Sequence, residues 1–164
     1  MQCPALSLLL MCLGTVLHVI GLASHQWSVE GDHSQGLWRY CIQYVCHGIP
    51  ERLSTDYLLT CRVLALAGMF FSFVSVTLIG LAIHCKTKQP RIMVLTLSST
   101  ASSSVSYACI VSCAAVWRSI YSDMAGIGFS FIISIIGGTF LIVGVVSFLY
   151  YIKTDKCDRR LLSI

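Results

Sequence analysis

The side chains best suited to covalent or metal chemistry are concentrated in residues 25–57. They are two cysteines and three histidines: Cys41, Cys46, His25, His33 and His47. Four residues separate the two cysteines, which is enough for a tight hairpin to bring their sulfur atoms together. Structural zinc sites usually combine two short ligand pairs, whereas this segment has one cysteine pair and scattered histidines. The spacing therefore favours a disulfide over a metal site, provided that the segment lies in an oxidising compartment.

Arrangements typical of catalysis are lacking in the long apolar segments of the sequence. These segments carry no paired carboxylates, no Ser-His-Asp set in a plausible order and no glycine loop of the kind that binds phosphates. We therefore expect no enzymatic activity, no cofactor, no small-molecule substrate and no nucleic-acid partner. The one imidazole within them, His18, has no acid there to exchange a proton with. It is expected to be neutral and hydrogen-bonded across a helix bundle.

The composition shows what kind of scaffold holds these side chains. Of the 164 residues, 56% are hydrophobic and 11% are charged, and the mean hydropathy is +0.80. A soluble domain carries about 25% charged residues. Crossing a bilayer takes about 20 apolar residues, and four segments qualify: residues 5–24, 58–83, 92–116 and 127–152. We predict an all-α integral membrane protein, a single domain over residues 1–164 whose four helices form a bundle in the lipid bilayer.

The basic residues predict the orientation of this bundle. Seven of the eleven lie in the connector 84–91 and the tail 153–164: Lys86, Lys88, Arg91, Lys153, Lys156, Arg159 and Arg160. The positive-inside rule places these two segments in the cytoplasm. Both termini are then cytoplasmic, and loops 25–57 and 117–126 are extracellular at the plasma membrane. A cleaved signal peptide over residues 1–24 is the alternative, although the segment lacks a basic start and is longer than a usual signal core.

Loop 25–57 has the pattern of a small β structure. Residues 27–29 and 37–42 have strand character, with Gly31 and Gly36 between them and Gly48 and Pro50 after the second. The extracellular side is oxidising, so a disulfide is the expected state of the two loop cysteines.

Trp27 lies just beyond the first span, where an indole favours the membrane interface. Arg62, near the outer end of the second span, is expected to anchor the loop by reaching headgroups or an acid, the candidate acids being Glu51, Asp56 and Asp123.

Small residues recur at helical spacing in three of the spans. They are Ala65, Gly68, Ser72, Ser75 and Ala82 in the second; Ser98, Ser102, Ser106, Cys109 and Cys113 in the third; and Ser130, Ser134, Gly138 and Gly144 in the fourth. Helices in lipid associate through close backbone approach and hydrogen bonds. We interpret these stripes as packing within the monomer, with an oligomer face or a pore lining as the alternative. Cys12 and Cys61 are likewise interpreted as small packing residues.

Three cysteines are expected at the cytoplasmic boundary of the membrane: Cys3, Cys85 and Cys157. Cysteines beside a membrane are the usual sites of reversible palmitoylation, and we state this modification as a hypothesis for all three.

Several of these residues form an ordered motif between the first loop and the second span. Trp27, Gly36-Leu37-Trp38, Cys41, Cys46 and Arg62 follow the order W, GLW, C, C, R. This order resembles that of the claudin superfamily, and in particular its branch of peripheral myelin, epithelial membrane and lens fibre membrane intrinsic proteins. The string QGLWRYC and the segment 128–138 look most like the lens fibre membrane intrinsic protein and claudin-domain-containing relatives. The resemblance covers nearly the whole chain.

The resemblance implies a claudin-like fold and a non-catalytic role. The implied fold is a left-handed four-helix bundle with a small extracellular antiparallel β-sheet, which a Cys41–Cys46 disulfide closes and the motif tryptophans tie to the bundle. The implied role is in cell–cell adhesion or in the organisation of cell junctions or membrane domains. The implied partners are other membrane proteins, either further copies of this chain or a partner on an apposed cell.

Three departures from the superfamily bear on this role: two from the claudins, in loop length and tail, and one from the epithelial and myelin members, in the missing sequon. The first loop has only 33 residues, the chain contains no asparagine for an N-glycosylation sequon, and the tail matches only a loose PDZ ligand through Leu162 and Ile164. The short loop favours junction or membrane organisation over a tight-junction pore. A cation-selective paracellular pore or a channel-associated subunit is the alternative function, in which four loop acids attract cations: Glu30, Asp32, Glu51 and Asp56.

Overall fold

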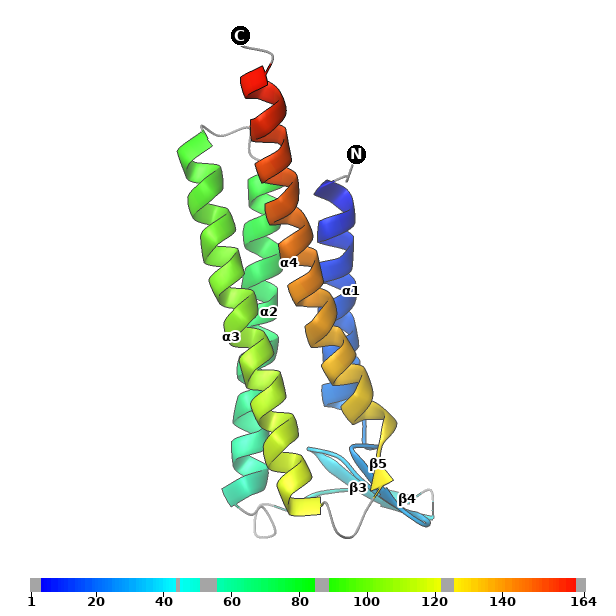
Figure 1. The fold of residues 1–164 in the computed structure, drawn as a ribbon. Helices are drawn as coiled ribbons and strands as arrows, with labels where there is room; N and C mark the ends of the chain where they lie inside the picture. The colour runs from blue at the N-terminus through cyan, green and yellow to red at the C-terminus, as the bar shows by residue number, and fades with distance from the viewer. Residues whose placement is uncertain (1–3, 44, 51–55, 85–88, 122–125, 162–164) are drawn as a thin grey trace.

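Four long helices lie side by side in the computed structural model (Figure 1). The structure describes residues 4–43, 45–50, 56–84, 89–121 and 126–161, with the backbone alone at 89–91, 120–121 and 155–161. The helices are α1 (Pro4–Ala23), α2 (Asp56–His84), α3 (Gln89–Tyr121) and α4 (Phe129–Leu161). They match the four predicted spans, except that α1 ends one residue earlier and α4 begins two residues later than predicted, because Ile127 belongs to the sheet. Helices α3 and α4 continue well past the apolar segments, because Arg and Lys are good helix formers and do not end a helix that leaves the membrane.

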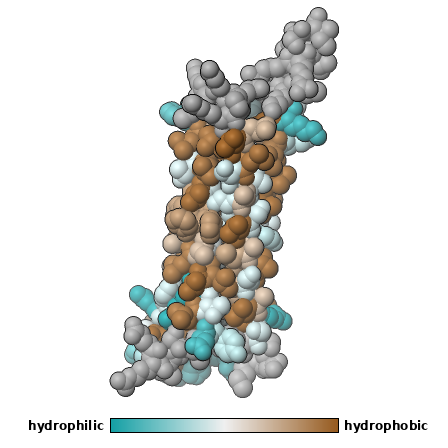
Figure 2. Space-filling model, turned by 90° about the vertical axis from the view of Figure 1, so that its left-hand side faces the viewer, coloured by the Kyte–Doolittle hydropathy of each residue, from teal (hydrophilic) through white to brown (hydrophobic). Residues whose placement is uncertain are grey.

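All four helices are long and apolar enough to cross a membrane. Exposed leucine, isoleucine, valine and phenylalanine side chains surround the bundle between its two ends. Figure 2 shows this apolar middle between hydrophilic side chains at both ends. A soluble monomer rarely exposes so large an apolar surface, whereas lipid solvates it well. These features indicate a multi-pass membrane protein.

A five-stranded antiparallel sheet lies at one end of the bundle, opposite the end where α1 begins and α4 ends (Figure 1). In the order β4-β3-β2-β1-β5, its strands are Val45–Gly48, Arg39–Ile42, His33–Gln35, Ser28–Glu30 and Gly126–Ile127. The two predicted strand segments correspond to β1 and β3. Strands β2, β4 and β5 were not predicted, because they are too short or too polar to show an alternating apolar pattern. Strand β5 precedes α4 and joins the sheet by pairing with β1.

Helix α1 packs chiefly on α4 through glycines. A Cβ atom on Gly14 would lie 2.5 Å from the carbonyl oxygen of Gly137, and one on Gly137 would lie 2.6 Å from the carbonyl oxygen of Gly14. A Cβ atom on Gly21 would lie 2.7 Å from the carbonyl oxygen of Ser130. The two helix backbones therefore touch, which is the packing that small residues allow between helices in lipid.

Helix α2 packs chiefly on α3 through serine hydroxyl groups. The Ser75 hydroxyl forms hydrogen bonds with those of Ser99, at 2.8 Å, and Ser103. Further along the pair, the Ser106 hydroxyl donates to the Gly68 carbonyl oxygen at 2.8 Å. These bonds join the two helices without relying on the hydrophobic effect, which lipid does not provide between helices.

Most of the predicted small-residue stripes are buried inside the chain, in agreement with packing within the monomer. Ser98 is an exception: it is exposed, and the buried face of α3 runs through Ser99 and Ser103 instead. A simple four-residue step drifts off the face of a helix with 3.6 residues per turn, which explains the error. The interpretation of Cys12 as a packing residue is also wrong, because its side chain is exposed.

His18 links the two helix pairs. Its Nδ1 atom lies 2.7 Å from the Ser134 hydroxyl of α4, and its Nε2 atom lies 3.3 Å from the Ala65 carbonyl oxygen of α2. Since the carbonyl can only accept, Nε2 carries the proton and the Ser134 hydroxyl donates to Nδ1. This is the hydrogen-bonded histidine that the sequence predicted, and it joins α1 to both neighbours in the half of the bundle nearer the sheet.

Candidate functional site

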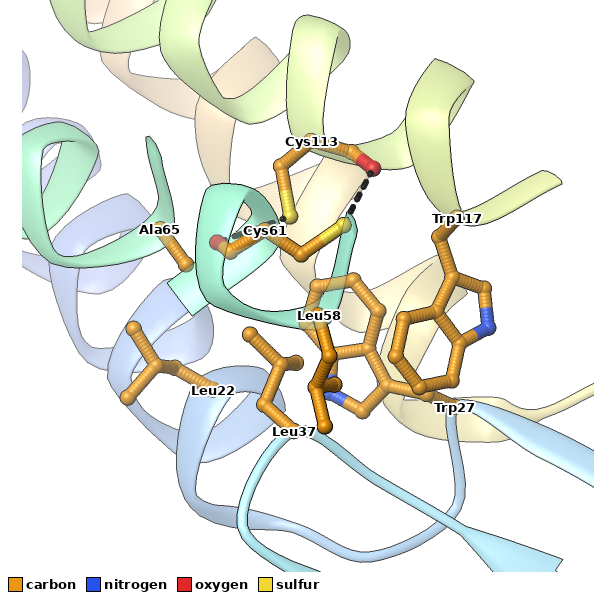
Figure 3. Packing of buried hydrophobic residues seen from close by; sticks show 8 residues of the cluster. All are labelled: Leu22, Trp27, Leu37, Leu58, Cys61, Ala65, Cys113 and Trp117. Atoms are coloured by element: carbon orange, nitrogen blue, oxygen red, sulfur yellow. Dashed lines mark hydrogen bonds between the residues drawn. The ribbon is translucent and has the colours of Figure 1, made fainter. Parts of the chain in front are cut away.

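The best-defined candidate site is the buried cluster where the sheet meets the helices. Its members come from three helices and from the segment that forms the sheet: Leu22, Trp27, Leu37, Leu58, Cys61, Ala65, Cys113 and Trp117 (Figure 3). The motif predicted Trp27 and Leu37 but missed Leu58 and Trp117. Position is the signal that could have found them, since both lie at the sheet end of their helices. A large apolar residue there can cover the underside of an attached sheet.

The indoles of Trp27 and Trp38 bind the last carbonyl groups of α1. Trp27 Nε1 donates to the Gly21 oxygen at 2.7 Å, and Trp38 Nε1 donates to the Leu22 oxygen at 3.1 Å. The last four carbonyl groups of a helix have no partner within it, so these two bonds satisfy groups that would otherwise be orphaned. Trp27 is 2% exposed and faces protein, so its side chain does not contact lipid headgroups as an interfacial indole would.

Gly36 allows the sheet to approach the end of α1 closely. A Cβ atom on Gly36 would lie 2.6 Å from the Ser24 carbonyl oxygen and 2.7 Å from the His25 Cα atom. Both neighbours are backbone atoms, so only a residue without a side chain fits here. The next residue, Leu37, is fully buried among the helices. The Gly-Leu-Trp string thus provides a close backbone contact, an apolar anchor and a hydrogen-bond donor in succession.

Arg62 of α2 also binds the Gly-Leu-Trp string. Its Nε atom donates to the Leu37 carbonyl oxygen at 2.7 Å, and its guanidinium group lies 5.1 Å from the centre of the Trp38 ring. The predicted anchoring role therefore has a structural basis. The prediction that Arg62 pairs with Asp56 is wrong. Within the described residues no ion pair joins that acid to Arg62. Glu51 and Asp123 lie outside the described residues.

We expect Arg62→Met to loosen the sheet without unfolding the helices. The substitution keeps a long apolar chain but removes a charged hydrogen bond worth about 1.5–3 kcal/mol and a cation–π contact worth about 0.5–1 kcal/mol. Limited proteolysis of segment 25–57 should become at least several times faster. Arg39→Met, which removes an exposed arginine from β3, is the control. Equal proteolysis rates in the two variants would contradict the anchoring role.

A disulfide joins Cys41 of β3 to Cys46 of β4, as predicted. The two residues lie directly opposite each other in the strand register. In the chain-entropy account, closing so short a loop contributes roughly 2 kcal/mol. Strand β4 lies at the edge of the sheet and all four of its residues are exposed. The disulfide therefore fixes a strand that has only one neighbouring strand and little burial to stabilise it.

The sheet presents an exposed face that carries apolar and aromatic side chains. Neighbouring residues of a strand point to opposite faces, so the residues paired across β3 and β4 define this outer patch: Tyr40, Ile42, Val45 and His47. Ile42 and Val45 pair directly and are 42% and 59% exposed. The rings of Tyr40 and His47 lie 5.6 Å apart. The outer patch therefore combines exposed aliphatic surface with an aromatic pair.

The structure describes some of the remaining predicted residues and not others. Glu30, Asp32 and Asp56 are exposed, as expected for acids of a solvated loop. Cys61 and Cys113 lie in the buried cluster as predicted, each thiol directed at the carbonyl oxygen of the other residue. The other predictions concern Cys3, Glu51, Cys85, the Cys157 side chain, Leu162 and Ile164, which lie outside the described residues.

Comparison of the sequence with protein-family models and with curated proteins finds no match.

Proposed function

We propose that the protein crosses the plasma membrane four times, with both termini in the cytoplasm and the sheet outside the cell. Three observations support this orientation. Arg91 near the start of α3, and Lys153, Lys156, Arg159 and Arg160 near the end of α4, belong to helix ends that lie opposite the sheet (Figure 1). The sheet contains the disulfide, which suits an oxidising compartment. The loop that bears the sheet, residues 25–57, has only two basic residues, Arg39 and Arg52.

We further propose membership of the claudin superfamily, in the branch of the peripheral myelin, epithelial membrane and lens fibre membrane intrinsic proteins. The support is geometric. The motif residues, which are spread over residues 27–62, meet at the single junction between sheet and helices or close the sheet beside it. Each of these residues has a distinct physical task at the junction or in the sheet, and this supports the proposed family.

The function that this arrangement supports best is non-enzymatic organisation of cell junctions, adhesion or membrane domains. The observation that carries it is the outer patch, an exposed aliphatic and aromatic surface on a sheet that is firmly attached to the helices. Aromatic side chains are enriched at protein interfaces and charged ones are depleted from their cores. The patch suits contact with another membrane protein, either a second copy or a partner on an apposed cell.

We expect Val45→Glu to weaken contact through the outer patch. A carboxylate buried in an apolar interface has no partner, so binding should weaken at least tenfold. Aggregation of cells that express the protein, together with native gel electrophoresis of detergent extracts, measures the loss. Val29→Glu is the matched control, because Val29 is also an exposed valine of the sheet but lies on the opposite face.

Surface labelling of both variants first establishes that equal amounts reach the plasma membrane. Adhesion and complex formation that survive in Val45→Glu at the level of Val29→Glu would contradict the proposed role of the patch.

A further inference from the structure

One histidine lies beside the disulfide of the sheet. A ring nitrogen of His25 and the sulfur atoms of Cys41 and Cys46 all lie within 4.8 Å of one another. His25 is half-buried, Cys41 is buried and Cys46 is exposed. The three side chains thus form a compact group that solvent reaches from the Cys46 side.

The other two histidines of the loop cannot join this group. His33 pairs with Ile42 and His47 pairs with Tyr40. Residues that pair directly share a face, and successive residues of a strand alternate between faces. Both histidines therefore lie on the face opposite the two sulfur atoms. Of the three loop histidines considered as metal ligands from the sequence, only His25 lies beside the two sulfur atoms.

The backbone holds His25 in this position from both sides. The Ser24 amide donates to the Ile20 carbonyl oxygen at 3.1 Å, which continues the last turn of α1. On the other side, the Trp27 amide donates to the Gln35 carbonyl oxygen at 3.0 Å. Gly36 packs directly against the His25 backbone. A ligand held in this way loses little conformational entropy when it binds a metal ion.

We propose that reduction of the Cys41–Cys46 disulfide converts this group into a zinc site with His25 as the third protein ligand. Two molecules of a small thiol supply the two electrons that break the S–S bond and the two protons that the cysteines take up, and they leave joined as one disulfide. The two sulfur atoms take up one proton each, and Zn²⁺ displaces both protons when it binds the two thiolates. A bound metal ion thus replaces the disulfide as the link between strands β3 and β4.

The ligand set fits zinc. Zinc binds cysteine sulfur at about 2.3 Å and histidine nitrogen at about 2.0–2.1 Å in tetrahedral geometry, and three protein ligands leave the fourth position to water. The present spacing of the three ligand atoms requires only small movements to reach such a centre, because all lie within 4.8 Å of one another. Thiolate and imidazole are soft or borderline ligands, so calcium and magnesium should not bind.

Titration of the full-length protein with Co²⁺, a coloured substitute for zinc, tests this site. The reduced protein in lipid nanodiscs should show a thiolate-to-cobalt absorption band at one ion per chain, which Zn²⁺ displaces and Mg²⁺ does not. The oxidised protein should not show it, and neither should a Cys41→Ser/Cys46→Ser variant, which retains the other cysteines. His25→Ala should weaken binding at least roughly tenfold, whereas His33→Ala, the control on the opposite face, should bind like the wild type.

A second measurement needs no substitution at His25. Zn²⁺ added after reduction should protect Cys41 and Cys46 of the wild-type protein from maleimide, as read by mass spectrometry of the peptides. Three outcomes would each overturn the proposal: a band that persists in the double serine variant, equal affinity in His25→Ala and His33→Ala, or no protection of the wild-type cysteines by zinc. None of these depends on whether the outer patch binds a partner.

Discussion

Trp27→Ala should cost the protein about 3–5 kcal/mol of stability, the range for removing a fully buried tryptophan. Trp27 contacts Trp117 and Phe131 edge to face, with ring centres 5.4 and 6.0 Å away. It also provides the hydrogen bond to the Gly21 carbonyl oxygen. Its removal therefore leaves a cavity under the sheet and an orphaned carbonyl group at the end of α1. Most native proteins have only about 5–15 kcal/mol to lose.

The loss is measured as the midpoint of thermal unfolding in detergent micelles, followed by size-exclusion chromatography of the soluble fraction. Trp27→Phe separates the two contributions, because it keeps most of the apolar surface and removes the hydrogen bond, worth about 1 kcal/mol. Tyr57→Ala is the control, since Tyr57 is 63% exposed at the start of α2. A Trp27→Ala midpoint that matches the Tyr57→Ala midpoint would show that the junction does not stabilise the fold.

Gly14→Val should separate α1 from α4 and destabilise the protein by at least about 2 kcal/mol, in the upper part of the range for overpacking. The new Cβ atom would lie 2.5 Å from the Gly137 oxygen and 3.0 Å from the Leu141 nitrogen. Both are backbone atoms of α4, so no side-chain rotation relieves the clash. The helices must move apart, which also strains the His18–Ser134 hydrogen bond between them.

Gly80→Val is the matched control for this prediction. Gly80 is also a helical glycine, but a Cβ atom there would meet nothing within 4 Å. The same change of residue type should therefore alter stability by no more than about 0.5 kcal/mol. Thermal unfolding in the same micelles compares the two variants. If both unfold at the same temperature, close α1–α4 contact is not a source of stability.

The helices and the disulfide could be predicted because each depends on local information. A run of apolar residues long enough to cross a bilayer is visible without any knowledge of its neighbours. The Cys41–Cys46 pairing needs only four intervening residues and an oxidising side of the membrane. His18 was also predictable, because a buried imidazole needs hydrogen-bond partners wherever it lies.

The features that were missed depend on tertiary contacts. The sequence placed Trp27 beside the membrane interface but did not predict its burial against Trp117, which comes from a helix far along the chain. Strand β5 has two residues and exists only because β1 offers it a free edge. Arg62 was expected to reach an acid or a headgroup, yet the partners that the structure gives it are the Leu37 carbonyl oxygen and the Trp38 indole. No periodic pattern along the sequence reports such contacts.

The pairing of the first helix with the last has a consequence for how the protein is made. Helices α2 and α3 are neighbours in sequence and can associate as soon as both have left the ribosome. Helix α1 must wait for α4, and the edge of β1 must wait for β5, which directly precedes α4. Contacts between such distant parts of a chain form late. The sheet is therefore completed only after Gly126 and Ile127 have been synthesised, and α1 finds its main helix partner only when α4 follows.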